Sequence, residues 1–165
     1  MNIAVLSLGS NMGDRLSNLE KAIALLAGLP ASVSKKSGVY ETAAWGNTNQ
    51  PSFYNQVLEI KTDLDAFSLM EKILMIEKKM GRVRIMKWEP RIIDIDILFF
   101  NDGQINTPEL TIPHPFLHER KFVLEPLNEI LPEKMHPTLK KSVSQLRSGL
   151  NEDTSVVKLI TIARA

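Results

Sequence analysis

The chain has 165 residues, of which 44% are hydrophobic, with no cysteine and a formal net charge of +1. This length and hydrophobic share fit one domain with a core of its own, which we expect to span residues 1–165. The charge excludes a global basic field for nucleic acid, the lack of cysteine excludes disulfides and thiolate sites, and no apolar run reaches the ~20 residues of a membrane span.

The first expected elements are a strand and a helix. Residues 2–8 form an apolar run that predicts a central strand and lacks the layout of a signal peptide, so a cytoplasmic location is expected. The Gly-Ser-Asn turn at 9–11 lacks the glycines and lysine of a P-loop, which favours a tight connection over a phosphate site. Apolar residues at helical spacing then predict a helix over 14–29, with Asp14 as its N-cap.

Two strands with a long connection come next. The pattern predicts a second strand over 31–41 and a third over 53–62. The connection 42–52 is rich in turn formers, carries Trp45 and is long for a hairpin, and such loops are often functional. Asn55 could read a hydrogen-bonding heterocycle because an amide offers a donor and an acceptor, although an ordinary exposed asparagine is the simpler interpretation.

A second helix is expected over 63–80, capped by Asp63 or Asp65 and closed by a glycine. Glu77 lies near its C-terminal end, where the helix dipole disfavours a carboxylate. A cation such as Arg82 or Arg84 would compensate for this, and a ligand hydroxyl would serve equally well.

The stretch 81–100 (GRVRIMKWEPRIIDIDILFF) changes character at its middle. Its second half is an apolar strand that is interrupted only by Asp94 and Asp96. Residues i and i+2 of a strand share a face, so both aspartates point one way and the intervening isoleucines point the other. Its first half is a cationic loop with one aromatic residue, and the side chains concerned are Arg82, Arg84, Lys87, Trp88 and Arg91.

Asp94 and Asp96 predict a metal site. Two like charges this close repel each other unless cations lie between them, and Mg²⁺, which prefers oxygen ligands, meets that need. The alternative is a solvent-facing pair on a half-exposed strand. The apolar character of the strand favours burial, where uncompensated aspartates would be costly. A basic loop that leads into such a pair predicts phosphate and metal binding.

The remaining segments supply a second cluster for anions and complete the fold. Residues 101–103 (NDG) are a hairpin-turn signal, and His114, stiffened by a proline on each side, forms the cluster with Arg120.

Helices over 122–130 and 140–150 and a strand over 155–162 follow. Up to residue 100 the expected elements follow the order strand, helix, strand, strand, helix, strand, which predicts a ferredoxin-like βαββαβ core of the α+β class. In this core an antiparallel sheet carries helices on one face, and a C-terminal extension follows.

Several motifs occur in a collinear arrangement: GSN at 9–11, QP at 50–51 with Asn55, GRVR at 81–84, W-x-P-R-x-x-D-x-D at 88–96, PH at 113–114 and R-x-F at 120–122. With these motifs the chain resembles, to about residue 135, the 6-hydroxymethyl-7,8-dihydropterin pyrophosphokinases of folate biosynthesis. The resemblance implies a Mg²⁺-dependent transferase that moves pyrophosphate from ATP to the hydroxymethyl group of the pterin and releases AMP.

The resemblance also implies residue roles. Asp94 and Asp96 would hold two Mg²⁺ ions, and Arg82, Arg91 and Asp96 would be the catalytic residues. ATP would contact Glu77, Arg82, Arg84, Trp88, Arg91, His114 and Arg120. The pterin would contact Thr42, Ala43, Trp45, Asn55 and, on its two ring faces, Phe53 and Phe122. The partners would be these small molecules, without nucleic acid or membrane, and the protein would be a monomer.

Three positions depart from the pattern of that family. Glu89 stands where a glycine or small residue is usual, Phe53 replaces a tyrosine, and Glu109 occupies a position that is often basic. Glu89 bears on the conformation of a loop, Phe53 on a hydroxyl contact and Glu109 on a nucleotide contact. None of the three belongs to the metal pair.

Two other functions suit a ferredoxin-like fold. A nucleotidyltransferase also carries spaced carboxylates on strands, but Phe53, Asn55 and Phe122 suit a flat heterocycle. An RNA-binding module would present aromatic residues on its sheet, and the near-zero charge and the aspartate pair argue against it.

Overall fold

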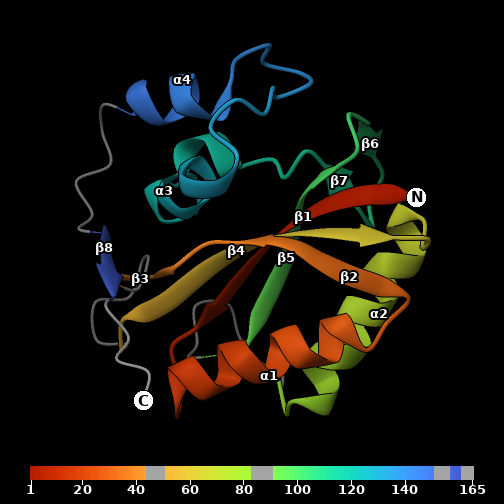
Figure 1. The fold of residues 1–165 in the computed structure, drawn as a ribbon, viewed down its shortest axis with the longest axis vertical. Coiled ribbons are helices and arrows are strands. Elements are labelled where there is room, and N and C mark those ends of the chain that lie inside the picture. The colour runs from red at the N-terminus through yellow and green to blue at the C-terminus, as the bar shows by residue number, and fades with distance from the viewer. Residues whose placement is uncertain (44–50, 83–90, 151–156, 161–165) are drawn as a thin grey trace.

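The computed structural model describes residues 1–43, 51–82, 91–150 and 157–160. Within these ranges it contains a six-stranded antiparallel sheet with helices on both faces (Figure 1). The elements in chain order are β1 (Asn2–Ser10), α1 (Arg15–Ala27), β2 (Ala31–Lys36), β3 (Val39–Thr42), β4 (Phe53–Thr62), α2 (Ala66–Lys79), β5 (Asp94–Phe100), β6 (Ile105–Asn106), β7 (Thr111–Ile112), the 3₁₀ turn η1 (Leu117–Glu119), α3 (Lys121–Ile130), α4 (Val143–Ser148) and β8 (Val157–Ile160).

The sheet has the expected ferredoxin-like arrangement. Its strands lie in the order β5-β1-β4-β3-β8, and β2 also pairs with β4. The first strand therefore lies between the third and the last strand of the βαββαβ pattern, and all its pairings are antiparallel. The prediction of an α+β fold with an antiparallel sheet is confirmed.

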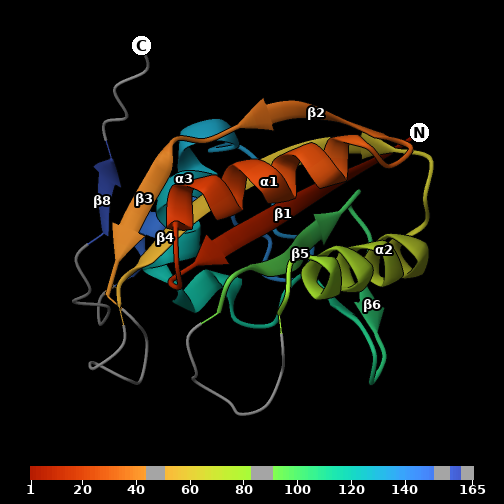
Figure 2. The same cartoon turned by 90° about the horizontal axis from the view of Figure 1, so that it is seen from below.

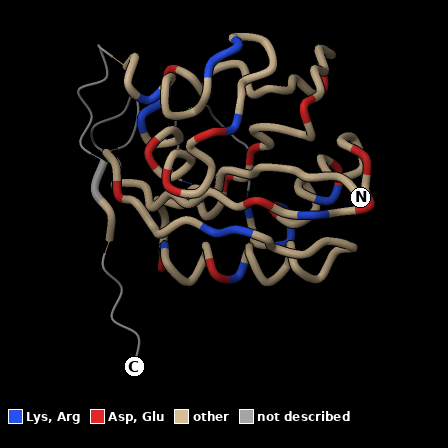
Figure 3. Tube along the Cα trace, turned by 45° about the horizontal axis from the view of Figure 1, so that its top comes forward, with Lys and Arg blue, Asp and Glu red and all other residues tan. Residues whose placement is uncertain are grey.

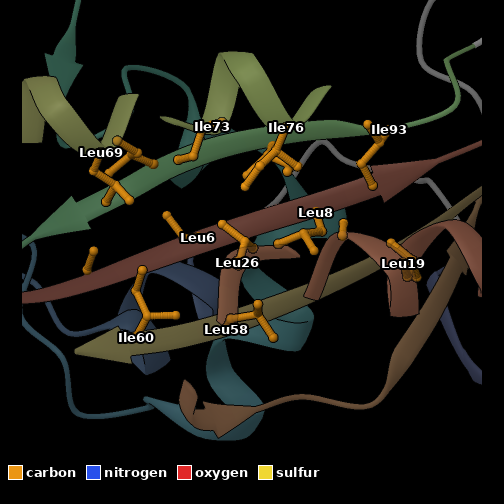
Figure 4. Packing of buried hydrophobic residues seen from close by; sticks show 14 of the residues in the cluster. Leu6, Leu8, Leu19, Leu26, Leu58, Ile60, Leu69, Ile73, Ile76 and Ile93 are labelled. Carbon is orange, nitrogen blue, oxygen red and sulfur yellow. The ribbon is translucent and has the colours of Figure 1, made fainter. Parts of the chain in front are cut away.

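Helices α1 and α2 cover one face of the sheet (Figure 2). Each begins at an aspartate whose side chain accepts a backbone N–H three residues later, Asp14 from Ser17 (3.1 Å) and Asp65 from Ser68 (2.8 Å). Their apolar sides pack on alternate residues of β1, β4 and β5 (Figure 4), and the fully buried members include Leu6, Leu8, Leu19, Leu26, Leu58, Ile60 and Leu69.

The opposite face of the sheet is also covered, which corrects the expectation of helices on one face. There α3, α4 and η1 pack in a second core that includes Val57, Leu98, Phe99, Leu124 and Leu127. Two consecutive residues of β5 reach this core because the β1–β5 pairing shifts register between Val5 and Leu6. The C-terminal extension therefore forms the second helical layer.

The predicted second strand, 31–41, is divided into β2 and β3. Between them the hydroxyl oxygen of Ser37 accepts the N–H of Val57 (2.9 Å), and the side chain of Gln56 donates to the carbonyl of Ser37 (2.7 Å). The N–H of Ser37 still donates to the carbonyl of Val57 (2.9 Å), but side chains take over the return bond, so the regular ladder with β4 is interrupted at this point.

Two shorter expectations also need correction. The turn at 101–103 is present, but β6, which follows it, pairs with β7 in a separate two-stranded sheet and forms no hairpin with β5. The helix expected over 140–150 is limited to α4, whose N-cap Ser142 forms a capping box with Gln145.

Charged residues are interspersed along the described trace (Figure 3). None of the helices in the described ranges is long and apolar enough to cross a membrane.

Candidate active site

A cavity opens on the face of the sheet that carries α3. Its walls come from β1, β3, β4 and β5, from the segments before β5 and after β7, and from the start of α3. The lining residues are Ser7, Gly9, Thr42, Ala43, Phe53, Asn55, Arg91, Asp94, Asp96, Leu98, His114, Arg120, Phe122 and Val123. The fold thus brings residues predicted for ring, phosphate and metal binding into one place.

Gly9 forms part of the cavity floor. It pairs with Asp94 of β5 on one side and with Asn55 of β4 on the other, so the three residues lie in one row across the sheet. A Cβ atom on Gly9 would lie 3.1 Å from Oδ1 of Asn55 and 3.5 Å from Cδ1 of Phe53. The missing side chain leaves space between Asp94 and Asn55, which are two strand spacings, or about 10 Å, apart.

The two aspartates lie on the cavity side of β5, and Ile93, Ile95 and Ile97 are buried on the other side, as predicted. Asp94 forms ion pairs with Arg82 (2.7 Å) and Arg91 (3.0 Å). Asp96 forms no ion pair with any described residue. Burial and, after it, the charge of Asp94 raise the pKa of Asp96 to about 7. A cation in the cavity would stabilise this carboxylate.

Arg82 lies between two carboxylates behind the cavity. Its Nη1 contacts Oε2 of Glu77 at 2.5 Å and Oδ1 of Asp94 at 2.7 Å. Burial alone would lower the pKa of Arg82, but the charges of Asp94 and Glu77 outweigh it and raise the pKa above its usual value. The same Oε2 of Glu77 accepts the N–H of Ile95 at 2.8 Å. Glu77 thus connects the end of α2 to the strand that carries the aspartates.

His114 and Arg120 form the opposite wall. Burial and, after it, the charge of Arg120 lower the pKa of His114 to about 4, so the ring is neutral at pH 7. Its Nδ1 accepts the N–H of Phe116 (3.1 Å), which leaves the proton on Nε2 as a donor. The Arg120 guanidinium lies 5.5 Å from the ring centroid of Phe116 and 5.6 Å from that of Phe122. The wall therefore offers a neutral and a charged donor.

Two buried polar atoms at the cavity have no hydrogen-bond partner within the described part of the chain, Nδ2 of Asn55 and Oγ1 of Thr42. Leaving such an atom unpaired costs about 1–3 kcal/mol. A ligand that offers an acceptor to the amide and a complementary group to the hydroxyl would recover this free energy.

A second cavity adjoins the first across β5. Its wall on α2 is apolar, and its other side chains, from β5 and the β6–β7 region, are mixed. The lining residues are Met70, Ile73, Leu74, Ile95, Asp96, Ile97, Glu109, Leu110, Thr111, His114 and Pro115. Asp96 and His114 line both cavities. Two ligands bound in these cavities would meet at the carboxylate of Asp96.

The donor set at this junction fits Mg²⁺. Within the described residues no three or more carboxylate, histidine or cysteine side chains cluster closely enough to hold a metal. A metal bound here would have Asp94 and Asp96 as its carboxylate ligands. Mg²⁺ commonly binds one or two carboxylates and completes its shell with water and substrate phosphates, so a carboxylate pair beside a ligand cavity suits it.

The positions of the predicted site residues differ by group. Of the pterin set, Thr42, Ala43, Phe53, Asn55 and Phe122 line the first cavity, as do Arg91, His114 and Arg120 of the ATP set. Arg82 and Glu77 line neither of the two cavities and are instead bonded to Asp94 and Ile95. Trp45, Arg84, Trp88 and the atypical Glu89 lie outside the described residues.

Sequence reasoning missed Ser7 and Gly9 and the apolar wall of the second cavity. Ser7 and Gly9 could have been predicted, because they are the small residues on one face of an otherwise apolar strand. The apolar wall gave no such signal, since its residues look like ordinary core positions. The backbone N–H of Asn11 donates to the carbonyl of Arg91 (3.1 Å), in line with a structural turn at 9–11.

Comparisons with known proteins show the family to which the chain belongs. The family model described as "7,8-dihydro-6-hydroxymethylpterin-pyrophosphokinase (HPPK)" matches residues 5–132. A 2-amino-4-hydroxy-6-hydroxymethyldihydropteridine pyrophosphokinase of Aquifex aeolicus is 46% identical over 147 residues, which cover 89% of this chain and 91% of that protein. The protein of the same name from Bacillus subtilis is 48% identical over 130 residues, which cover 78% of each.

Solved structures support the fold. A crystal structure of Plasmodium falciparum HPPK-DHPS with pteroate matches with a TM-score of 0.70 and 20% sequence identity. The match covers 89% of this chain but only 44% of that longer chain.

Proposed function

Because the chain belongs to the 7,8-dihydro-6-hydroxymethylpterin-pyrophosphokinase family, it transfers pyrophosphate from ATP to hydroxymethyldihydropterin, and we propose that its two cavities hold these substrates on either side of Asp96. The observation that carries this proposal is that Asp96 and His114 line both cavities. The residue roles below belong to the proposal, as does the assignment of residues 1–165 to one catalytic domain.

The first cavity is the proposed pterin site. The unpaired Nδ2 of Asn55 and Oγ1 of Thr42 suit the amide-like edge of a pterin, which carries both donors and acceptors. Phe53 and Phe122 line the same cavity and offer aromatic faces to a flat ring. Gly9 lies between Asn55 and Asp94, which are about 10 Å apart, and its missing side chain leaves the space between them open. A ring held by Asn55 would therefore direct its substituent toward the aspartates.

The second cavity is the proposed nucleotide site. Its apolar wall suits the faces of an adenine ring, and the triphosphate would extend toward Asp96 and His114. Nε2 of His114 and the guanidinium groups of Arg91 and Arg120 are donors suited to phosphate oxygens. Arg91 forms an ion pair with Asp94 (3.0 Å), so a bound metal and the phosphates of ATP would each compete for a side chain that is already oriented.

Asp94 and Asp96 are the proposed ligands of two Mg²⁺ ions. When bound, the ions neutralise phosphate charge and acidify the acceptor hydroxyl. ATP contributes about four negative charges, so two Mg²⁺, the two aspartates and two arginines close the charge balance.

The transfer itself needs positioning and charge neutralisation more than covalent catalysis. The hydroxymethyl oxygen of the pterin forms a bond to the β-phosphorus of ATP, and the bond from that phosphorus to the oxygen bridging the α- and β-phosphates breaks, which releases AMP. A carboxylate oxygen of Asp96 accepts the hydroxyl proton in this scheme. Arg91 stabilises the charge that develops on the leaving α-phosphate.

The direct test mixes the protein with ATP, Mg²⁺ and 6-hydroxymethyl-7,8-dihydropterin and follows AMP by chromatography. We expect AMP only when pterin and metal are both present. Formation of AMP at an undiminished rate with a chelator present would contradict the metal proposal. Formation of ADP in place of AMP would contradict the site of attack.

Replacing Arg91 by alanine is expected to lower kcat by about 100-fold, because a preorganised charge donor at the phosphates is lost, and to leave the pterin KM within about threefold. Steady-state kinetics with each substrate varied at saturating concentration of the other measures both values. The matched control is Arg147→Ala, which removes an exposed arginine that pairs with Glu125 of α3 and lines neither cavity, and it should leave both constants unchanged. A large rise in pterin KM with normal kcat would remove Arg91 from the phosphate site.

Family membership decides against a nucleotidyltransferase and an RNA-binding module.

The monomeric state and the cytoplasmic location stay predictions. Sedimentation of the purified protein would test the monomeric state.

A further inference from the structure

The turn between β1 and α1 contacts the site from outside the pterin cavity. None of residues 10–15 lines that cavity. Yet their side chains reach the start of β4, which carries Phe53, and the segment before β5, which carries Arg91. Asn11 and Arg15 make these contacts.

Asn11 is fully buried and bridges the two segments. Its Nδ2 donates to the carbonyl of Pro51 (3.2 Å), and its Oδ1 accepts the N–H of Arg91 (2.7 Å). Its own N–H donates to the carbonyl of Arg91 (3.1 Å). One side chain thus fixes the distance between the backbone two residues before Phe53 and the backbone of Arg91.

Arg15, like Asn11, holds the segment directly before β4. Its Nη1 donates to the carbonyl (3.0 Å) and to the hydroxyl (2.7 Å) of Ser52 and lies 3.3 Å from Oε2 of Glu41. The Ser52 hydroxyl donates to that same Oε2 (2.7 Å), and the guanidinium lies 3.9 Å from the ring centroid of Tyr54. Each partner of Arg15 adjoins a residue of the pterin cavity, Thr42 or Phe53.

We propose that Asn11 and Arg15 are positioning residues that hold the pterin-binding end of β4 in register with Arg91 and the aspartates. The proposal rests on the placement of the pterin against Phe53 and Asn55. In-line transfer between two bound substrates tolerates little misplacement, and an error of about 1 Å can cost about 100-fold in rate. A brace outside the cavity sets this geometry without contacting either substrate.

Arg15→Met is the decisive variant, because Arg15 is partly exposed and methionine keeps an unbranched apolar stem. We expect the pterin KM to rise about tenfold, equivalent to about 1.4 kcal/mol, with the ATP KM within about twofold of wild type. Arg147→Met, at an exposed ion pair whose arginine lines neither cavity, is the matched control and should change neither constant.

Asn11→Asp separates the two arms of the bridge. It keeps an acceptor for the N–H of Arg91 but presents an oxygen, in place of the amide donor, to the carbonyl of Pro51. We expect it to raise the pterin KM as Arg15→Met does, and Asn11→Ala, which loses both arms, to lower kcat about tenfold as well. A residue that only supports folding would lower the melting temperature without this division between pterin KM and ATP KM.

Asn55→Ala distinguishes the possible failures. If Asn55→Ala raises the pterin KM and Arg15→Met does not, the positioning role is wrong and the pterin placement stands. If Asn55→Ala leaves the pterin KM unchanged, the placement is wrong and the positioning role is overturned with it. A rise in both variants, with Arg147→Met unchanged, supports the proposal.

Discussion

Replacing Asp96 by asparagine is expected to lower turnover about 1000-fold, equivalent to about 4 kcal/mol of activation free energy, while the protein stays folded. A neutral amide oxygen is a weaker ligand for Mg²⁺ than a carboxylate and cannot take up the hydroxyl proton. The fold should tolerate the change because burial already raises the pKa of Asp96 to about 7, which means that the folded protein disfavours its charged form. The kcat at saturating substrates and the melting temperature of the ligand-free protein measure the two effects.

The control for this variant lies just beyond the other end of β5. Asp102 is exposed and contacts Lys134 at 2.7 Å, so Asp102→Asn should keep normal turnover and lose at most about 1 kcal/mol of stability. If Asp96→Asn keeps wild-type turnover, the metal assignment and the role of Asp96 as a base are both wrong. A fall in its melting temperature larger than that of Asp102→Asn would point to a structural role instead.

The local features of the site could be read from the sequence because they depend on spacing along the chain. The alternation of Asp94 and Asp96 with isoleucines placed both carboxylates on one face of β5, and the structure confirms this. The capping aspartates of α1 and α2 were readable for the same reason, since the cap and the N–H that it accepts are three residues apart.

The features that the sequence did not show depend on register between distant strands. From the strand pattern alone Asn55 looked like an ordinary exposed residue, and only the family resemblance assigned it to the pterin. Its pairing with Gly9, which in turn pairs with Asp94, places it in the cavity. The division of the second strand at Ser37 depends on hydrogen bonds to Gln56 and Val57 of β4, about 20 residues away in sequence. The second cavity arises where α2 and the β6–β7 region meet, and such an arrangement is fixed only by tertiary packing.

Glu77 shows how the structure adds a second interpretation to a residue that the sequence assigned to the nucleotide. It is 2% exposed, and its Oε2 accepts both the guanidinium of Arg82 and the N–H of Ile95. Glu77→Ala is expected to lower the free energy of unfolding by about 3–5 kcal/mol, because Arg82 loses one of its two carboxylates and Ile95 loses its acceptor. Urea denaturation followed by circular dichroism measures this loss.

Two further variants decide between stability and nucleotide binding. Glu71→Ala, an exposed glutamate of the same helix, should change stability by less than about 0.5 kcal/mol. Glu77→Gln keeps an oxygen acceptor for the N–H of Ile95 and should recover part of the stability lost in Glu77→Ala. If Glu77→Ala were instead as stable as wild type and raised only the ATP KM, the carboxylate would act on the nucleotide directly. The expected order of stability, with Gln between wild type and Ala, follows because one of the two described contacts survives the amide substitution and neither survives truncation.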